Sequence, residues 1–258
     1  MAGTNVLIGT PTAGGVVKVQ YTHTVANTIR DLARNGIGVD YLTFDGPDNA
    51  IGRDYIASHM LEKGHTHLLF VDSDMWFDGT LCRRMIGLEK PLVGCVYAKR
   101  RLDFGQVERN LEMADHRIDA ALALSLEYNV VLPDGPLRVE NGLCRVHAFG
   151  MGAVLIQRQV FEAMIEKRVS TLSRAGAALG VANPQYDFFA HIAGPDGAML
   201  GEDYSFCQKW REGCGGDVWA LVDADIRHIG DMAYGVPFLK RLNAIAAAAR
   251  TIGEPVRP

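Results

Sequence analysis

The chain has 258 residues, of which 48% are apolar and 22% charged, and its formal net charge is −4. This composition fits a globular α/β protein with a large core and excludes extended disorder and coiled coils, while the negative charge disfavours nucleic acid as a partner. Five cysteines without a C-x-x-C pair indicate a reducing compartment, and no apolar run reaches the roughly 18 residues of a membrane span, so we expect a cytoplasmic protein.

The first hundred residues alternate between strand and helix patterns. Near-continuous apolar runs predict strands at 5–9, 39–44, 67–71 and 92–97, and helical periodicity predicts helices at 22–34, 50–63 and 79–88, the last with Asp78 as N-cap. This order predicts a mostly parallel central sheet flanked by helices. Polar segments begin at Thr10, Asp45 and Asp72, where the carboxyl ends of three strands should meet, and this edge is the expected place for a nucleotide or phosphate ligand.

The second half is less regular. We expect helices at 107–126, 159–167, 202–212 and 237–252, and strands at 130–132, 137–146, 153–156, 218–222 and 226–229. Residues 170–201 are rich in Gly, Pro, Asn and Asp, which predicts a mobile lid or an acceptor loop. No repeat or linker is present, so the chain is interpreted as one domain spanning 1–258 with two lobes.

Asp72-Ser73-Asp74 follows the apolar run HLLFV directly. Two carboxylates at positions i and i+2 can share one divalent cation, and oxygen ligands favour Mg²⁺ or Mn²⁺. The spacing alone is not specific, because Asp223-Ala224-Asp225 repeats it and a solvated capping turn has the same pattern. Its place after a predicted buried strand distinguishes the first motif. A basic cluster, Lys99 to Arg101, offers an anion contact.

These motifs, in this order, resemble the GT-A glycosyltransferases, especially the family 2-like group. The resemblance covers about residues 5–230, from the first strand and its Thr-Pro-Thr end to FGMGAVLI at 149–156 and GEDYSF at 201–206. It implies a GT-A-like (Rossmann-like) sheet with a nucleotide-binding lobe at about 1–100, a smaller mixed acceptor-side lobe at about 101–235 and a C-terminal helix at 236–258.

The resemblance also implies roles for single residues. Asp72 and Asp74 would hold the donor ribose and a Mn²⁺ or Mg²⁺ ion, and His228 would complete the metal shell, although a hydrogen-bonded core histidine is an equal alternative. Arg53 would contact the nucleotide, with a surface salt bridge as its alternative. The residues that would line the donor site are Thr10, Pro11, Thr12, Asp45 and Ser73.

Glu202 and Asp203 match the acidic pair that supplies the general base of inverting members. A carboxylate near an acceptor hydroxyl can take its proton, so we assign Asp203 as the base and Glu202 as the second candidate. Two acids in the first turn of a helix can also stabilise its dipole without catalysis. The residues assigned to the sugar or the acceptor are His147, Gly150, Gly152 and Trp210.

The expected function is metal-dependent transfer of a sugar from a nucleoside-diphosphate donor to a hydroxyl acceptor, with inversion at the anomeric carbon. We expect a non-processive enzyme, because the Q-x-x-R-W motif of processive synthases is absent. A sugar-phosphate nucleotidyltransferase stays an alternative, because Thr12 to Lys18 faintly resembles a glycine-rich phosphate loop. A non-catalytic nucleotide-sugar binding protein is the other. A homo-oligomer is compatible with the sequence, which determines neither the donor nor the acceptor.

Overall fold

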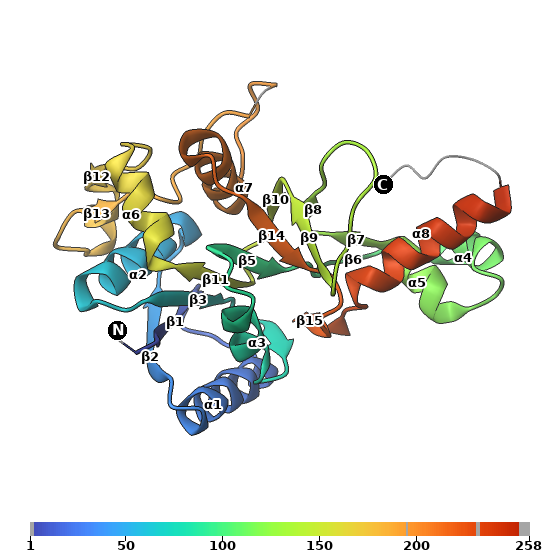
Figure 1. Cartoon of the computed structure of the whole chain (residues 1–258), viewed down its shortest axis with the longest axis horizontal. Coiled ribbons are helices and arrows are strands. Elements are labelled where there is room, and N and C mark those ends of the chain that lie inside the picture. Colours follow the sequence, from blue (N-terminus) through green and yellow to red (C-terminus); the bar gives the residue numbers. More distant parts are fainter. Residues whose placement is uncertain (1–2, 195, 231–232, 253–258) are drawn as a thin grey trace.

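The computed structural model describes residues 3–194, 196–230 and 233–252, so the ends of the predicted 1–258 domain and residue 195 of the predicted loop lie outside it. Its centre is a seven-stranded sheet in the order β2-β1-β3-β11-β5-β14-β9 (Figure 1). The bounds of these strands, in sheet order, are Gly38–Asp45, Asn5–Thr12, His67–Val71, Ala153–Gln157, Leu92–Cys95, Val218–Leu221 and Leu143–Val146.

Five of the seven strands run in the same direction. Strands β2, β1 and β3 pair in parallel, as do β5 and β14, while β11 and β9 are antiparallel to their neighbours. The predicted α/β architecture with a mostly parallel sheet is therefore confirmed. Strands β1, β3, β11 and β5 are buried on both faces, as a sheet covered by helices requires, whereas the edge strand β2 is largely exposed.

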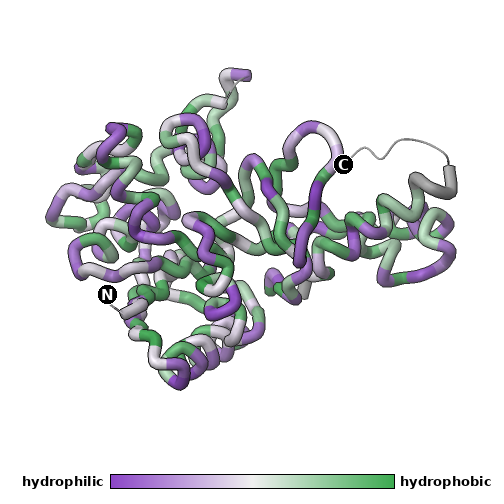
Figure 2. The backbone as a smooth tube through the Cα atoms, viewed as in Figure 1, coloured by the Kyte–Doolittle hydropathy of each residue, from purple (hydrophilic) through white to green (hydrophobic). Residues whose placement is uncertain are grey.

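Helices cover the two faces of the sheet. On one face, α1 (Val19–Arg34) and α3 (Leu81–Gly87) pack against Val6 and Ile8. On the other, α2 (Asn49–Lys63), α6 (Arg158–Glu166) and α7 (Glu202–Gln208) pack with Leu7 and Phe70. In Figure 2 the green, apolar stretches of the tube run through the central strands, and many of the outer loops are purple.

An arm extends from the sheet, with α4 (Phe104–Met113), α5 (Ile118–Ser125) and α8 (Phe238–Ile252) at its end (Figure 1). The predicted single helix 107–126 is wrong: Asp115 and His116 adopt φ values of 52° and 58°, which end one helix before the next begins. The elements of the arm and of the region joining it to the sheet are β6 (Ala98–Leu102), α4 (Phe104–Met113), α5 (Ile118–Ser125), β7 (Leu126–Tyr128), β8 (Val130–Val131), β10 (Ala148–Phe149), β15 (Ile226–Ile229), β16 (Ala233–Tyr234) and α8 (Phe238–Ile252).

Several other predicted boundaries need correction. Strand β1 continues to Thr12, so Thr10-Pro11-Thr12 is the end of a strand and not a loop. The predicted strand 137–146 is shortened to β9, because Asn141 and Gly142 form a turn with positive φ. Asp78 accepts a hydrogen bond from the Thr80 N–H, and α3 begins at Leu81, two residues later than expected, so Thr80 and not Asp78 is its N-cap. The loop 170–201 holds β12 (Leu172–Ser173), a 3₁₀ helix (Ala175–Leu179) and β13 (Gln185–Tyr186).

Strand β4 (Met75–Phe77), which follows the acidic motif, was not predicted. It pairs antiparallel with β15 and places Met75 opposite His228. This pairing brings a residue from the end of the chain back to the carboxyl end of β3. Among the described residues, no helix is both long and apolar enough to cross a membrane.

Candidate functional site

The acidic motif lies in a tight turn at the carboxyl end of β3. The N–H of Asp72 donates to the Gly152 carbonyl over 3.0 Å, and the N–H of Met75 donates to the Asp72 carbonyl over 3.1 Å. The Ser73 carbonyl accepts from the N–H of Lys18. The side chains of Asp72 and Asp74 are 27% and 17% exposed, so both carboxylates are partly open to solvent while the backbone that carries them is held.

Arg53 is buried beneath this turn. Its side chain is 2% exposed, and its Nη2 donates to Asp72 Oδ1 over 2.7 Å. Its Nε lies 3.7 Å from Glu202 Oε1, and its guanidinium lies over the Phe70 ring. The alternative of a surface salt bridge is therefore wrong. Burial alone would lower the pKa of Arg53, but Asp72 and Glu202 outweigh it and hold the pKa above its ordinary value.

Asp74 has a different set of partners. Its Oδ2 accepts from Arg100 Nη1 over 2.9 Å and lies 3.2 Å from His228 Nε2. Burial raises the pKa of Asp74, but His228 and Arg100 outweigh this effect and hold it below the ordinary range. The Arg100 side chain is 48% exposed, so it covers the carboxylate from the solvent side.

The protonation of His228 follows from its second contact. Its Nδ1 lies 3.2 Å from the Ala98 carbonyl oxygen, which can only accept, so Nδ1 carries a proton. Nε2 faces the Asp74 carboxylate, to which it donates a hydrogen bond when it carries a proton and beside which it can ligate a metal when it does not. An imidazole nitrogen beside a carboxylate, with the other ring nitrogen bonded to a carbonyl, is a donor set that suits Mn²⁺. No group of three or more His, Cys, Asp or Glu side chains suited to a metal occurs in the described ranges.

Asp203 lies at the start of α7, beside Glu202. Its Oδ1 accepts from the N–H of Tyr204 over 2.8 Å, and its Oδ2 lies 3.5 Å from Asn129 Nδ2. Burial, and then the negative charge of Glu202, raise the pKa of Asp203 to about 6. A carboxylate with this pKa is ionised at neutral pH and basic enough to accept a proton.

Tyr97 and Asn129 complete this side of the site, and no motif in the sequence indicated either residue. Asn129 accepts from the Tyr204 hydroxyl and donates to the Tyr97 hydroxyl, which also accepts from the Gly152 N–H. A Cβ atom at Gly150 would lie 1.9 Å from Asn129 Nδ2. Gly150 and Gly152 therefore allow the two polar side chains to approach the backbone next to Asp203 and Asp72.

The predicted donor residues at the ends of β1 and β2 differ in access. Thr10 is fully buried and hydrogen-bonded to the Tyr21 hydroxyl, which leaves it no contact with a ligand. Pro11 is buried too. Asp45 Oδ1 accepts from the Thr12 hydroxyl and from the N–H of Gly15, so Asp45 orders the loop after β1.

Two residues assigned to the sugar or acceptor lie elsewhere. Trp210 is 8% exposed in the core, and its Nε1 donates to the Asp217 carbonyl. Any side chain at Gly216 would overlap its ring, which indicates a packing role. His147 lies between β9 and β10 and lines a small cavity with Arg145 and Arg211, apart from the acidic residues described above. We therefore leave Trp210 and His147 out of the candidate site.

Asp54, next to Arg53, holds the chain that leads to Glu202. It is 8% exposed and accepts from the N–H of Phe189, while Lys209 donates to the carbonyls of Asp187 and Phe188. Burial raises the pKa of Asp54 to about 8. The pKa of an aspartate in the unfolded state is about 3.9. Between about pH 3.9 and pH 8 the folded state therefore binds more protons than the unfolded state, and the free energy of unfolding falls as the pH rises.

We therefore expect Asp54→Asn, which keeps a carbonyl acceptor for Phe189, to raise the melting temperature at pH 8. The effect should nearly vanish at about pH 3, where Asp54 is almost fully protonated in both states. Calorimetry of both proteins across this range measures it, with exposed Asp225→Asn as the control. An equal shift at both pH values would contradict the prediction.

The comparisons with known proteins concern the fold. No family model and no curated protein matches the sequence. The structure is similar to that of A197 from STIV, with a TM-score of 0.51, 18% identity and coverage of 90% of each chain. This likeness shows a shared fold and no more.

Two further solved structures match more weakly. One is a glycosyltransferase involved in the glycosylation of the major capsid of PBCV-1, with a TM-score of 0.32, 13% identity and coverage of 64% of this chain and 65% of that chain. The other is UDP-glucose pyrophosphorylase complexed with UDP-glucose, with a TM-score of 0.43, 8% identity and coverage of 97% of this chain and 99% of that chain.

Proposed function

We propose that the protein is a glycosyltransferase that moves a sugar from a nucleoside-diphosphate donor to a hydroxyl acceptor. One observation carries the proposal: buried Arg53 lies between Asp72 and Glu202, 2.7 and 3.7 Å from their carboxylates. It thereby joins the acidic motif at the end of β3 to the acids that begin α7. A glycosyltransferase needs acidic residues beside the leaving diphosphate and further acidic residues beside the acceptor.

In this proposal Asp74 and His228, with Asp72, would hold a divalent cation, and the cation would supply positive charge to the departing diphosphate. Arg53 holds Asp72 and Glu202 in place from below. The acceptor hydroxyl forms a bond to the anomeric carbon as the bond to the diphosphate breaks, and Asp203 takes the hydroxyl proton. The anomeric configuration inverts, because a single displacement occurs.

The pKa of Asp203 predicts how the transfer rate depends on pH. Because its pKa is raised to about 6, the basic form increases through that pH, and the rate should rise from pH 5 to pH 7. Glu202→Gln removes a negative charge that raises this pKa, so the same rise should occur at lower pH. Rate profiles of both proteins test this, and an unchanged profile would contradict the assignment.

The function is tested first by thermal shift with nucleoside diphosphates and their sugars, with and without Mn²⁺, since ligands of the folded state raise its melting temperature. We expect the melting temperature to rise only when both the nucleotide and Mn²⁺ are present. This rise should be lost in Asp74→Ala and His228→Ala. Asp225→Ala, in the second D-x-D sequence, is the matched control.

Turnover then separates the functions. Release of nucleoside diphosphate that depends on a hydroxyl acceptor and is blocked by EDTA supports the proposal. Pyrophosphate release from a nucleoside triphosphate and a sugar phosphate would identify a nucleotidyltransferase instead. Binding without turnover over a broad acceptor panel would identify a nucleotide-sugar binding protein.

A further inference from the structure

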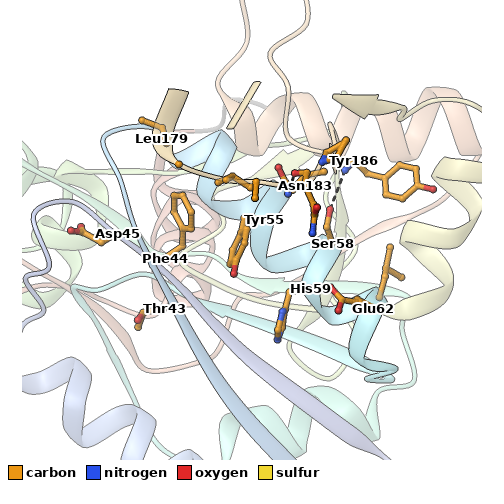
Figure 3. Close-up of a pocket in the computed structure, with 16 residues that line it drawn as sticks. Thr43, Phe44, Asp45, Tyr55, Ser58, His59, Glu62, Leu179, Asn183 and Tyr186 are labelled. Carbon is orange, nitrogen blue, oxygen red and sulfur yellow. Dashed lines mark hydrogen bonds between the residues drawn. The ribbon is translucent and has the colours of Figure 1, made fainter. Parts of the chain in front are cut away.

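A cleft that is separate from the candidate site around Arg53 opens beside the end of β2. It lies between that strand, the outer face of α2 and residues 179–186 of the long segment before α7 (Figure 3). Its volume of about 690 Å³ falls within the range of small-molecule sites. Asp45 is the residue that it shares with the predicted donor site, so the two sites adjoin at the end of β2.

One wall of this cleft is aromatic. The rings of Phe44 and Tyr55 lie 5.0 Å apart at 40°, and the rings of Tyr55 and His59 lie 6.3 Å apart at 22°. Tyr55 and His59 are one turn apart on α2, and Phe44 adds its ring from β2 (Figure 3). Phe44 and Tyr55 lie too close together to admit a ligand between them. They form a continuous surface on which the C–H face of a sugar ring can pack.

The polar groups around this wall suit hydroxyls. Asp45 and Glu62 offer carboxylate oxygens, and Asn183 offers both an amide donor and an acceptor. The Ser58 hydroxyl already accepts from the N–H of Tyr186, which fixes one side of the cleft. Sugar hydroxyls both donate and accept, so they can use all of these groups.

The charge of the lining disfavours anionic ligands. No lysine or arginine is among its lining residues in the part of the chain that the structure describes, whereas two carboxylates are. A cleft of similar size near β9 has the opposite character, with Lys90, Arg138 and Arg145 in its wall. Lys63, outside the lining, pairs with Glu62 over 3.1 Å, whereas Asp45 has no ion-pair partner among the described residues. A phosphate or a uronic acid would therefore meet repulsion beside Asp45.

We propose that this cleft binds a neutral oligosaccharide. The proposal goes beyond the proposed function, because it assigns a second carbohydrate site whose occupancy requires neither a nucleotide nor the acids around Arg53. Tyr55 provides the central stacking surface, and the carboxylates and Asn183 bind the hydroxyls at the rim.

The test is direct binding, measured by saturation-transfer NMR and calorimetry on the full chain without nucleotide or metal. The probes are neutral tri- and tetrasaccharides of glucose, mannose, galactose and N-acetylglucosamine, each paired with a phosphorylated counterpart. We expect at least one neutral probe to bind saturably and its phosphorylated form to bind at least about tenfold more weakly. Tyr55→Ala should weaken binding by about tenfold, as loss of an aromatic anchor does.

Two further variants make the result specific. Tyr41→Ala removes a tyrosine from the opposite face of β2 and should bind like the wild type. Ala182→Trp adds bulk at an exposed lining position, so it should abolish binding without lowering the melting temperature. Absence of binding by every neutral probe, undiminished binding to Ala182→Trp, or binding of nucleosides in place of sugars would overturn the proposal. None of these outcomes bears on sugar transfer.

Discussion

Replacement of Asp203 by asparagine should lower kcat for sugar transfer by about 10²–10⁴-fold, the usual contribution of a general base. Asparagine has the same shape and can still accept from the N–H of Tyr204, but it cannot take a proton. Asp203 has no hydrogen bond to Arg53 or to the turn at Asp72, so the affinity for the nucleoside diphosphate should not change. Steady-state kinetics and calorimetric titration of the nucleotide measure the two quantities.

The control for this change is Asp196→Asn, an exposed acid in the segment that precedes α7. It should keep the rate of the wild type. Equal losses of rate and of nucleotide affinity in Asp203→Asn would show that Asp203 organises the site and does not act on the acceptor. Retention of the rate would assign the base to another residue, and Glu202 is then the next candidate.

Asp72→Ala should lower the free energy of unfolding by about 3–5 kcal/mol, the cost of removing one partner from a buried ion pair. It leaves the Arg53 guanidinium, which is 2% exposed, without its 2.7 Å partner. Nε and Nη1 of Arg53 already have no hydrogen-bond partner among the described residues, and Glu202, 3.7 Å from Nε, would remain as an ion-pair partner without a hydrogen bond. Chemical denaturation monitored by circular dichroism measures the loss.

A double-mutant cycle separates this charge effect from the loss of packing. Arg53→Met combined with Asp72→Ala removes the stranded charge, so the double variant should be more stable than Asp72→Ala alone. Asp225→Ala breaks an exposed pair with Arg227 and should change the stability by no more than about 0.5 kcal/mol. A double variant no more stable than Asp72→Ala would contradict the buried-charge explanation.

This coupling affects how the acidic motif can be tested. Loss of activity in Asp72→Ala would mix an unfolding effect with the loss of a ligand. Asp74 is the cleaner position, because its partners Arg100 and His228 are more exposed than Arg53. The two aspartates of one motif therefore differ in their contacts: Asp72 pairs with the buried Arg53 side chain, and Asp74 faces His228.

The sequence by itself determined the alternation of strands and helices and the place of the acidic motif. These features depend on local patterns: a run such as HLLFV is apolar enough to be a buried strand wherever it pairs, and a polar turn must follow it. The parallel edge formed by β1, β2 and β3 followed from that pattern, as did the position of Asp72 at its carboxyl end.

Only the tertiary structure decided which distant side chains meet. Arg53 lies on a helix with a weak periodic pattern, and its burial depends on Phe70 below it and on Asp72 and Glu202 beside it. His228 reaches Asp74 because β15 pairs with β4, and Trp210 is in the core because Gly216 leaves room for its ring. Contacts between residues so far apart in the chain depend on how whole helices and strands pack together. The local periodicity of a sequence does not predict this packing.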